Sequence, residues 1–318
     1  MINLYGWDTV SLSEVSLVNK ALSAAENRLI TEFAFEEDGI ILSGRFGAWQ
    51  IVPGGGGHRM NVELPIVSGQ LDGDLGNVDL ANVTLTLRVI LRLLEPPDSP
   101  NARHLMFDLK ASLEKRGAVD PIKVDDPEGR LSDVQKRALV TLAAACLSNH
   151  SDQVSFVFAS VKSRGAVATD LLATPEHDWL VLNVIDGPQY IAILGALKRP
   201  PGGADAIDAQ LINGSPSAVL AVSNSMLASK FLYPSLSESF RPKSKFSVKG
   251  DMVGNARHIR LPRLKKGIWS VDLTIEKLTL QPQLNILRCH AYATAPLKLL
   301  AKFETTVDME MPVSFNSK

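Results

Sequence analysis

A long alternation of apolar and polar residues constrains the fold of this chain more than any other feature. Residues 83–93 carry an apolar side chain at every second position, from Val83 through Leu93. This period predicts a β-strand, because successive side chains of a strand point to opposite faces. Eleven residues at about 3.3 Å each would span about 35 Å, roughly twice the usual strand length. Such a strand is typical of an antiparallel sheet that covers a core with one face only.

The last third of the chain repeats this pattern. Strands are predicted over residues 245–250, 268–280, 284–293 and 303–313. The alternation slips at Glu276 and Lys277, which predicts a β-bulge. The last segment is the most regular. One face carries Phe303, Thr305, Val307, Met309, Met311 and Val313, and the other carries Glu304, Thr306, Asp308 and Glu310.

Three helices are also predicted. The first covers residues 11–29, where the spacing of Ser11 and Glu14 fits a capping box and apolar residues recur every three or four positions. The second begins at Ser132, with Gln135 completing a capping box, and its later part is almost wholly apolar. The third begins at Ser215, followed by proline at the first helical position. Each helix is expected to be enclosed by other elements.

Composition limits the class of protein. The 318 residues are 45% hydrophobic and 21% charged, with a net charge of −1, which excludes a mainly disordered chain and a general attraction to nucleic acid. No apolar run is long enough to span a membrane and no secretory signal is visible, so we expect a cytoplasmic protein, or one exported without a classical signal peptide. We expect one elongated body over residues 1–318. A two-lobe alternative divides it into 1–198 and 206–318, joined near 199–205, where prolines and glycines crowd together.

The residues that could perform chemistry are scattered. Glu176, His177 and Asp178 form one local cluster, and a solvated loop explains them better than a catalytic site. The glycine run at residues 54–57 lacks the Gly-Lys-Ser/Thr of a phosphate-binding loop, and a flexible loop is predicted instead. The histidine and cysteine spacings fit no metal site. We therefore expect no enzyme activity, no metal and no cofactor, apart from a bound lipid.

One segment is basic in an otherwise nearly neutral chain. Its positive charges could blunt an exposed strand edge, or they could contact anionic lipid headgroups. The candidates for headgroup contact are Arg257, Arg260, Arg263, Lys265 and Lys266.

The opening Tyr5-Gly-Trp-Asp8, with the helix predicted after it and the long strands that follow, resembles the start of the clostridial forty-seven-kilodalton accessory proteins of OrfX-type toxin gene clusters. Residues 222–226, Val-Ser-Asn-Ser-Met, strengthen the resemblance. That family belongs to the tubular lipid-binding (TULIP) superfamily. This chain is shorter than the family name implies, and it matches no functional-site motif of the family residue by residue.

The resemblance implies an α+β fold in which a long, highly curved antiparallel β-sheet wraps around long amphipathic helices, as in bactericidal/permeability-increasing-type tubes. It also implies a non-catalytic protein that binds lipid or a membrane surface, or other toxin-cluster proteins, but no nucleic acid. Acyl chains would lie in a groove between helix and sheet. The alternative is the same fold filled with side chains and serving as a protein-interaction module. The residues expected to line the groove are Val15, Val18, Leu22, Leu85, Leu87, Val89, Val222 and Met226.

Overall fold

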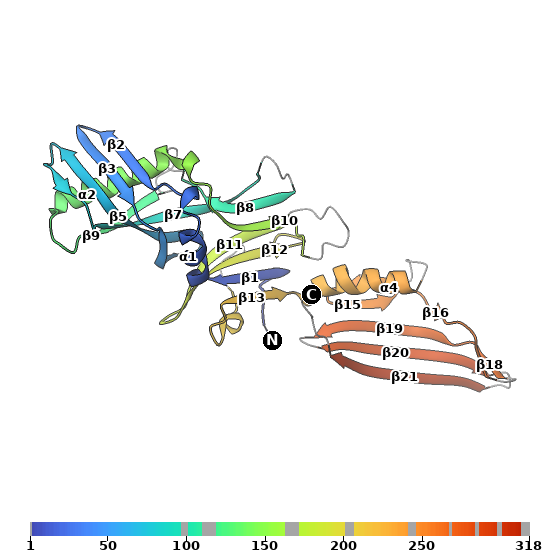
Figure 1. The fold of residues 1–318 in the computed structure, drawn as a ribbon. Helices are drawn as coiled ribbons and strands as arrows, with labels where there is room; N and C mark the ends of the chain where they lie inside the picture. The colour runs from blue at the N-terminus through green and yellow to red at the C-terminus, as the bar shows by residue number, and fades with distance from the viewer. Residues whose placement is uncertain are drawn as a thin grey trace. The chain divides into compact units, whose positions relative to one another are not determined.

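The computed structural model describes residues 2–96, 101–109, 119–162, 172–200, 207–240, 246–266, 269–283, 286–297 and 301–312 (Figure 1). The chain divides into two compact units. The larger unit comprises residues 10–166 and 173–220, and the smaller unit comprises residues 1–9, 167–172 and 221–318. The smaller unit therefore combines the first residues of the chain with its last third.

The larger unit is built on a nine-stranded antiparallel sheet whose central strand is β7 (Thr84–Leu94), the long alternating strand predicted from the sequence. It pairs with β5 along one side and with β9 and then β8 along the other. The remaining strands of this sheet are β2 (Glu32–Glu37), β3 (Ile40–Phe46), β4 (Gln50–Gly56), β5 (Arg59–Gly73), β6 (Val78–Asp79), β8 (Ala102–Phe107), β9 (Val119–Asp125) and β10 (Val157–Lys162).

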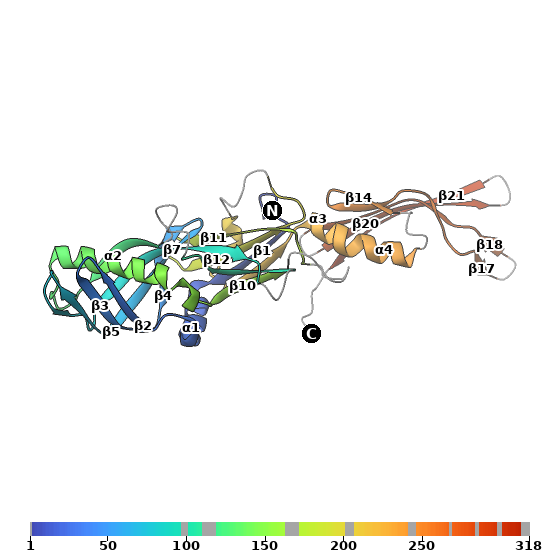
Figure 2. The same ribbon diagram turned by 90° about the horizontal axis from the view of Figure 1, so that it is seen from above.

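A four-stranded sheet accompanies it, in the order β11 (Glu176–Asn183), β12 (Gln189–Ala196), β1 (Thr9–Glu14) and β13 (Ala218–Val222), with β11 antiparallel to β12. Helix α2 (Asp133–Asn149) packs against the nine-stranded sheet, where it contacts β9, β2 and β7 (Figure 2). The shorter helical pieces of this unit are α1 (Val15–Ser23), η1 (Glu26–Arg28), η2 (Ser151–Gln153) and η3 (Ala209–Ile212). One large apolar core joins α1, α2 and the sheets.

The smaller unit contains a six-stranded antiparallel sheet, with β16 paired to β19 beside the main order β14-β15-β19-β20-β21. A helical segment packs on it against β14, β15 and β19. This segment runs through α3 (Asn224–Met226), a π-helical stretch η4 (Leu227–Leu232) and α4 (Tyr233–Ser239). Pro234 lies just after the π-helical stretch, and proline cannot donate the backbone hydrogen bond that a regular α-helix needs there. The strands are β14 (Phe246–Lys249), β15 (Met252–Asn255), β16 (Ile259–Arg260), β17 (Leu264–Lys266), β18 (Trp269–Val271), β19 (Thr274–Gln283), β20 (Ile286–Leu297) and β21 (Ala301–Pro312).

The expected fold class is wrong. The described residues form mainly strands, arranged in several antiparallel sheets, and the longest single helix among them is the 17-residue α2. No long amphipathic helix lies at the centre of a single curved sheet in the described ranges. Within these ranges, no helix is both long and apolar enough to cross a membrane.

The first predicted helix begins too early. Ser11 lies in β1, and Glu14 ends this strand, so the capping box does not form. Val10 and Leu12 alternate with polar neighbours and are buried. This short alternation competes with the helical spacing, and pairing of β1 with β12 and β13 decides in favour of the strand.

The third predicted helix also begins at the wrong residue. Residues 218–222 form β13, and the helix starts after Ser223, whose side chain caps it by accepting a hydrogen bond from the Met226 amide at 3.1 Å. Two other predictions are confirmed. Ser132 and Gln135 form the capping box of α2, and the register of β19 shifts between Ile275 and Lys277.

Candidate functional site

Among the strands and helices of the smaller unit whose side chains the structure describes, β21 has the most exposed residues. Its twelve residues pair with β20 from Ala301 to Pro312 without a register shift. It is the last strand in the order of its sheet, so no other strand in the described ranges pairs with its outer edge. The strand therefore offers a partner both its edge and its two faces.

One face of β21 is apolar. Val307 lies opposite Ala291 of β20, and Met309 lies opposite Cys289. Side chains directly opposite each other in an antiparallel pair project on the same side. Since Cys289 and Ala291 pack against the core beneath the helical segment, the apolar side chains of β21 extend that same face outward.

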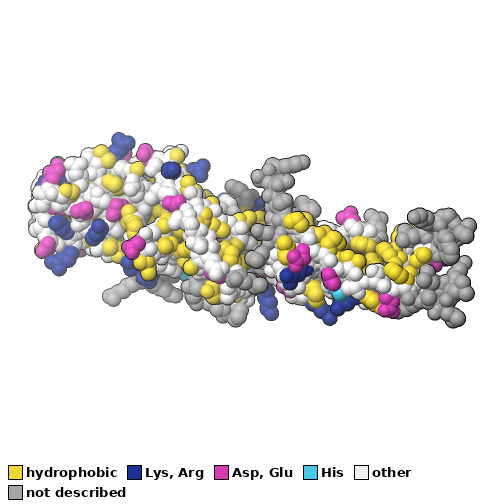
Figure 3. All heavy atoms as spheres, turned by 90° about the horizontal axis from the view of Figure 1, so that it is seen from below, with side chains coloured by type: hydrophobic (Ala, Val, Ile, Leu, Met, Phe, Trp, Pro, Cys, Tyr) yellow, Lys and Arg dark blue, Asp and Glu magenta, His cyan; other side chains and the backbone are white. Residues whose placement is uncertain are grey.

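This apolar face is uncovered. The exposed fractions are 51% for Phe303, 45% for Val307 and 46% for Met309. In Figure 1, β21 lies at the lower side of its sheet. Figure 3 views the molecule from below, and hydrophobic side chains gather over the smaller unit in that view. Large apolar side chains in a row on one strand mark a site of interaction more often than scattered ones do.

The opposite face of β21 is acidic. Glu310 accepts a hydrogen bond from Nε of Arg288 at 2.9 Å, and Asp308 lies 2.6 Å from Nδ1 of His290. Glu304 occupies the same face. All three carboxylates belong to exposed residues, so a group placed beside this edge meets negative charge on one side and apolar surface on the other.

The basic segment also belongs to the smaller unit. Arg263 forms a two-pronged ion pair with Asp272, at 2.7 and 2.8 Å. The hydrogen bonds and positive charge of Arg263, together with the charge of Arg260, hold the pKa of the Asp272 carboxyl below its usual value. Arg257 and Arg260 are exposed. The side chains of Lys265 and Lys266 lie outside the described part of the structure, although both residues belong to β17.

The residues predicted to line a lipid groove fall in both units. Leu22, Leu85, Leu87 and Val89 are at most 1% exposed and, with Val15, belong to the core of the larger unit. Val18 packs against that core. In the smaller unit, Met226 is 1% exposed and Val222 is partly buried. Their assignment to a groove stays a prediction.

The predicted solvated loop at Glu176 to Asp178 is instead the start of strand β11. Oδ1 of Asp178 lies 2.7 Å from Nε2 of His58, whose ring stands edge-on to Trp179. Burial alone would raise the pKa of Asp178, but the hydrogen bonds from His58 and from the Trp179 amide lower it overall. His177 contacts Thr174 at 3.0 Å, and burial together with the charge of Arg103 lowers the pKa of His177 to about 4.

The glycine run is not the flexible loop that the sequence suggested. Gly54 to Gly56 end strand β4, and the carbonyl of Gly57 accepts a hydrogen bond from the Val181 amide at 2.8 Å. Gln189 donates to the carbonyl of Gly54 and Asn183 donates to that of Gly55, at 3.2 and 3.3 Å. The run therefore fixes the β4–β5 hairpin onto β11 and β12.

The two stretches that carry the family resemblance lie together in the smaller unit. Ser223 and Ser225 both donate side-chain hydrogen bonds to Oδ1 of Asp8, at 2.7 and 3.2 Å. The backbone amide of Ser223 donates to the carbonyl of Asp8 at 2.7 Å. Trp7 is 3% exposed. Asp8 thus anchors the start of the chain to the residue that caps the helical segment.

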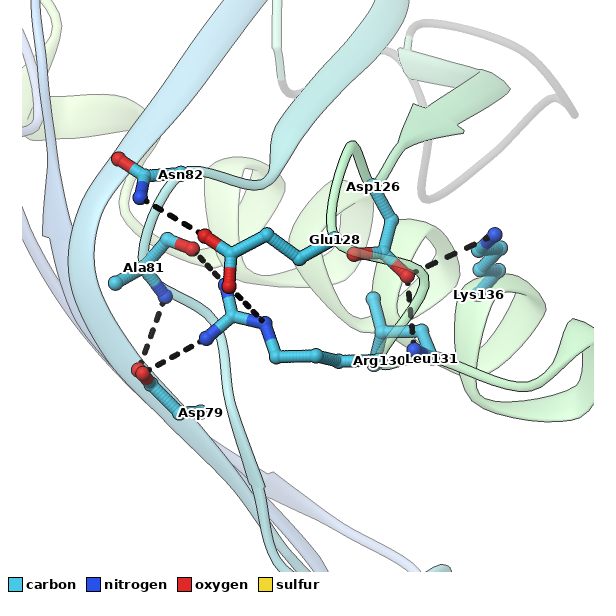
Figure 4. A network of polar contacts seen from close by, with 8 residues as sticks. All are labelled: Asp79, Ala81, Asn82, Asp126, Glu128, Arg130, Leu131 and Lys136. Carbon is cyan, nitrogen blue, oxygen red and sulfur yellow. Dashed lines mark hydrogen bonds and ion pairs between the residues drawn. The ribbon is translucent and has the colours of Figure 1, made fainter.

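A further polar network, centred on Arg130, connects two loops of the larger unit (Figure 4). Arg130 donates to Asp79 at 2.8 Å and also to the carbonyl of Ala81. Asn82 donates to Glu128 at 3.2 Å. The amide of Ala81 and the guanidinium of Arg130 hold the pKa of Asp79 below its usual value. These contacts join the turn before β7 to the loop before α2, which is a structural role.

The sequence predicts the alternation of β21 but not the exposure of its apolar face. An alternating strand is normally expected to bury its apolar face. Only the sheet order, with β21 at the edge and the helical segment over the other strands, leaves that face uncovered. The sequence does show Glu304, Asp308 and Glu310 at alternate positions, and this pattern indicates that the other face of the strand is exposed.

Comparisons with known proteins agree on one family. The model of the OrfX-like family, described as Protein OrfX2/OrfX3/P47, matches residues 4–312. Protein OrfX3 of Clostridium botulinum (strain Kyoto / Type A2) is 24% identical over 98% of this chain and 70% of its own length. Protein OrfX3 of Paraclostridium bifermentans is 30% identical, in a match that covers 37% of this chain and only 26% of that relative.

Solved structures share the fold. The structure of P47 from Clostridium botulinum A2 matches with a TM-score of 0.83 and 20% identity, covering 99% of this chain and 77% of that one. P47 of Clostridium botulinum E1 matches with a TM-score of 0.79 and 18% identity, covering 97% of this chain and 76% of that one. At this identity the likeness speaks for the fold alone.

Proposed function

Because the chain belongs to the OrfX-like family of OrfX2, OrfX3 and P47 proteins, accessories of toxin gene clusters, we propose that it is a non-catalytic accessory that binds another protein of such a cluster through β21. The observation that carries this proposal is the apolar face of β21, where Phe303, Val307 and Met309 are each about half exposed. Burying such side chains against a partner contributes about 25 cal/mol for each Å² of apolar surface removed from water.

The packing of the larger unit favours a protein-binding role over a lipid-filled interior. A bound acyl chain needs apolar side chains that are free to contact it. Leu85 and Leu87 contribute no exposed surface, so an acyl chain would have to displace the packed core around them. The exposed face of β21 requires no such rearrangement.

The first test replaces the apolar face. The variant combines Val307→Thr with Met309→Thr, because threonine is β-branched and suits a strand but is polar. We expect it to weaken binding to the partner about tenfold or more, because central apolar contacts dominate interface energies. Binding is measured by biolayer interferometry against each purified protein encoded in the same gene cluster.

The matched control is Ile41→Thr combined with Val67→Thr. These residues are also exposed, at 43% and 59%, but they lie in the larger unit. The control should bind as the unmodified chain does. Equal binding by the β21 variant and the unmodified chain would show that the partner contacts another surface.

A second candidate function is contact with anionic lipid headgroups, favoured by the exposed Arg257 and Arg260 of the basic segment. Each cation near an anionic surface contributes about 1 kcal/mol.

We expect Lys265→Glu combined with Lys266→Glu to weaken cosedimentation with phosphatidylserine-containing vesicles about tenfold or more. Lys20→Glu with Arg137→Glu, two exposed cations of the larger unit, is the control. Equal cosedimentation of both variants would remove this candidate, and native mass spectrometry of the purified chain would detect any retained lipid.

A further inference from the structure

The outer edge of β21 has the features of a strand that accepts another strand. In an antiparallel pair, alternate residues direct their N–H and C=O groups away from the neighbouring strand. Along the twelve residues of β21 these groups point outward from the sheet, since β20 occupies the other side. They can bind the backbone of an added strand, as in β-augmentation.

Two other edge strands of the described chain, β14 and β2, are shorter than β21. Edge strands are normally short, bulged or covered. At the opposite edge of the same sheet, β14 has four residues. In the larger unit, β2 has six residues, and its Phe33 is buried. By contrast, β21 is twice as long as β2, unbulged and apolar on an uncovered face.

The side chains of β21 specify the chemistry of the added strand. Neighbouring strands place directly opposite side chains about 4.5–5.5 Å apart on the same face. An added strand would therefore align one set of alternate side chains with Val307 and Met309, and the other set with Glu304, Asp308 and Glu310. Apolar residues suit the first set, and lysine or arginine suits the second.

A second copy of this chain fits that requirement poorly. If β21 paired antiparallel with β21 of a second copy, the two apolar faces would have to lie on the same side of the joined sheet. Since directly opposite side chains share a face, even positions would then pair with even positions. In the register centred on Val307, Glu304 faces Glu310 of the second copy. In the register centred on Thr306, Glu304 faces Asp308 while Glu310 faces Lys302, so like charges are opposed in both registers but are offset in the second. Like charges directly opposite destabilise a strand pair.

We propose that β21 binds an extended segment of its partner by strand addition, and that this segment alternates apolar residues with lysine or arginine. This inference rests on the proposed function, since it names how the same surface recognises its partner.

The experiment uses the full chain and a short, fluorescently labelled peptide that alternates lysine with valine. Anisotropy measures binding, and hydrogen exchange measures protection of the β21 amides. We expect the peptide to bind and to slow exchange along β21. A glutamate–valine peptide should bind at least about tenfold more weakly, because it places carboxylates opposite Glu304, Asp308 and Glu310. A peptide with all lysines before all valines should also bind at least about tenfold more weakly, because it cannot match both faces.

Backbone methylation isolates the strand pairing. Two further peptides carry N-methyl groups on alternate amides, one set on odd and one set on even positions. One of the two should lose binding, because in an added antiparallel strand alternate N–H groups bond to the neighbour. If both bind as well as the unmodified peptide, strand addition is wrong.

Removing the negative charges of β21 tests whether its carboxylates attract the lysines of the peptide. Glu304→Gln, Asp308→Asn and Glu310→Gln together should weaken binding of the lysine–valine peptide about tenfold and flatten its salt dependence. The matched control replaces three exposed glutamates of another edge strand, Glu32, Glu36 and Glu37, by glutamine. Unchanged affinity in the β21 triple variant would overturn the basic specificity, and dimerisation of the chain through β21 would overturn the choice of occupant.

The outcomes separate this inference from the proposed function. If Val307→Thr with Met309→Thr abolishes partner binding while both methylated peptides still bind, the surface is correct and strand addition is not. If that variant leaves partner binding unchanged, the proposed function itself fails. If the lysine–valine peptide does not bind at all, the inferred recognition chemistry is wrong.

Discussion

Replacing Leu87 by alanine is expected to lower the free energy of unfolding of the larger unit by about 2–5 kcal/mol. Leu87 is completely buried and lies in the central strand β7, opposite Val62 of β5 and Pro121 of β9. Neighbours held on both sides by sheet hydrogen bonds cannot move into the space that the missing methyl groups leave, so the loss includes a cavity cost. Urea denaturation followed by tryptophan fluorescence measures the effect, and two transitions are expected because the chain has two units.

This experiment also separates a packed core from a lipid groove. In a groove emptied of lipid, shortening Leu87 would remove little packing and should change the stability of the delipidated chain by less than about 1 kcal/mol. The control is Val67→Ala, at a position that is 59% exposed. A loss for Leu87→Ala no greater than that of the control would favour the groove.

Replacing Gly55 by alanine is expected to destabilise the larger unit by about 2–4 kcal/mol. The backbone φ of Gly55 is +79°, and a Cβ atom built there would lie 2.5 Å from the carbonyl oxygen of Arg59. That oxygen belongs to the paired strand β5, so the hairpin itself must shift. The shift would disturb the contacts of the glycine run with Asn183 and Gln189. Chemical denaturation gives the loss, and limited proteolysis near residues 53–58 reports whether the hairpin has detached.

Gly57→Asn provides the comparison within the same run. Gly57 also has a positive φ, +57°, but nothing lies within 4 Å of a Cβ atom built there. Asparagine adopts this backbone conformation more readily than other residues with a side chain, and its backbone carbonyl can still accept from Val181. We expect a change within about 1 kcal/mol. Similar stability of both variants would mean that the run is a flexible loop after all.

Local patterns predicted local structure well. The alternation at residues 83–93 predicted β7 almost to the residue, because a period of two over eleven positions does not fit a helix. The capping box at Ser132 predicted the start of α2, since both hydrogen bonds of that motif join residues three apart. The slip at Glu276 predicted the bulge of β19.

Predictions that depended on distant pairing failed. Residues 11–14 fit a helix start and a strand equally well, and the strand forms because the Glu14 amide bonds to the carbonyl of Ser217, about two hundred residues away. The contact of His58 with Asp178 spans 120 residues. The exposure of β21 depends on which strands the helical segment covers. None of these is encoded in a short window of sequence, so the exposed apolar face of β21 could be recognised only once the sheet order was known.

The contact of Asp8 with Ser223 has a consequence for biosynthesis. Residues 2–9 leave the ribosome well before Ser223, which follows Asp8 by 215 positions and donates a hydroxyl hydrogen bond to it. All residues of the larger unit are made between Asp8 and Ser223, so this unit can fold before that partner exists. During this interval Asp8 and Trp7 lack the rest of the smaller unit to which they belong. Completion of the smaller unit therefore waits until its later strands have been synthesised, and residues 2–9 stay available to chaperones until those strands emerge.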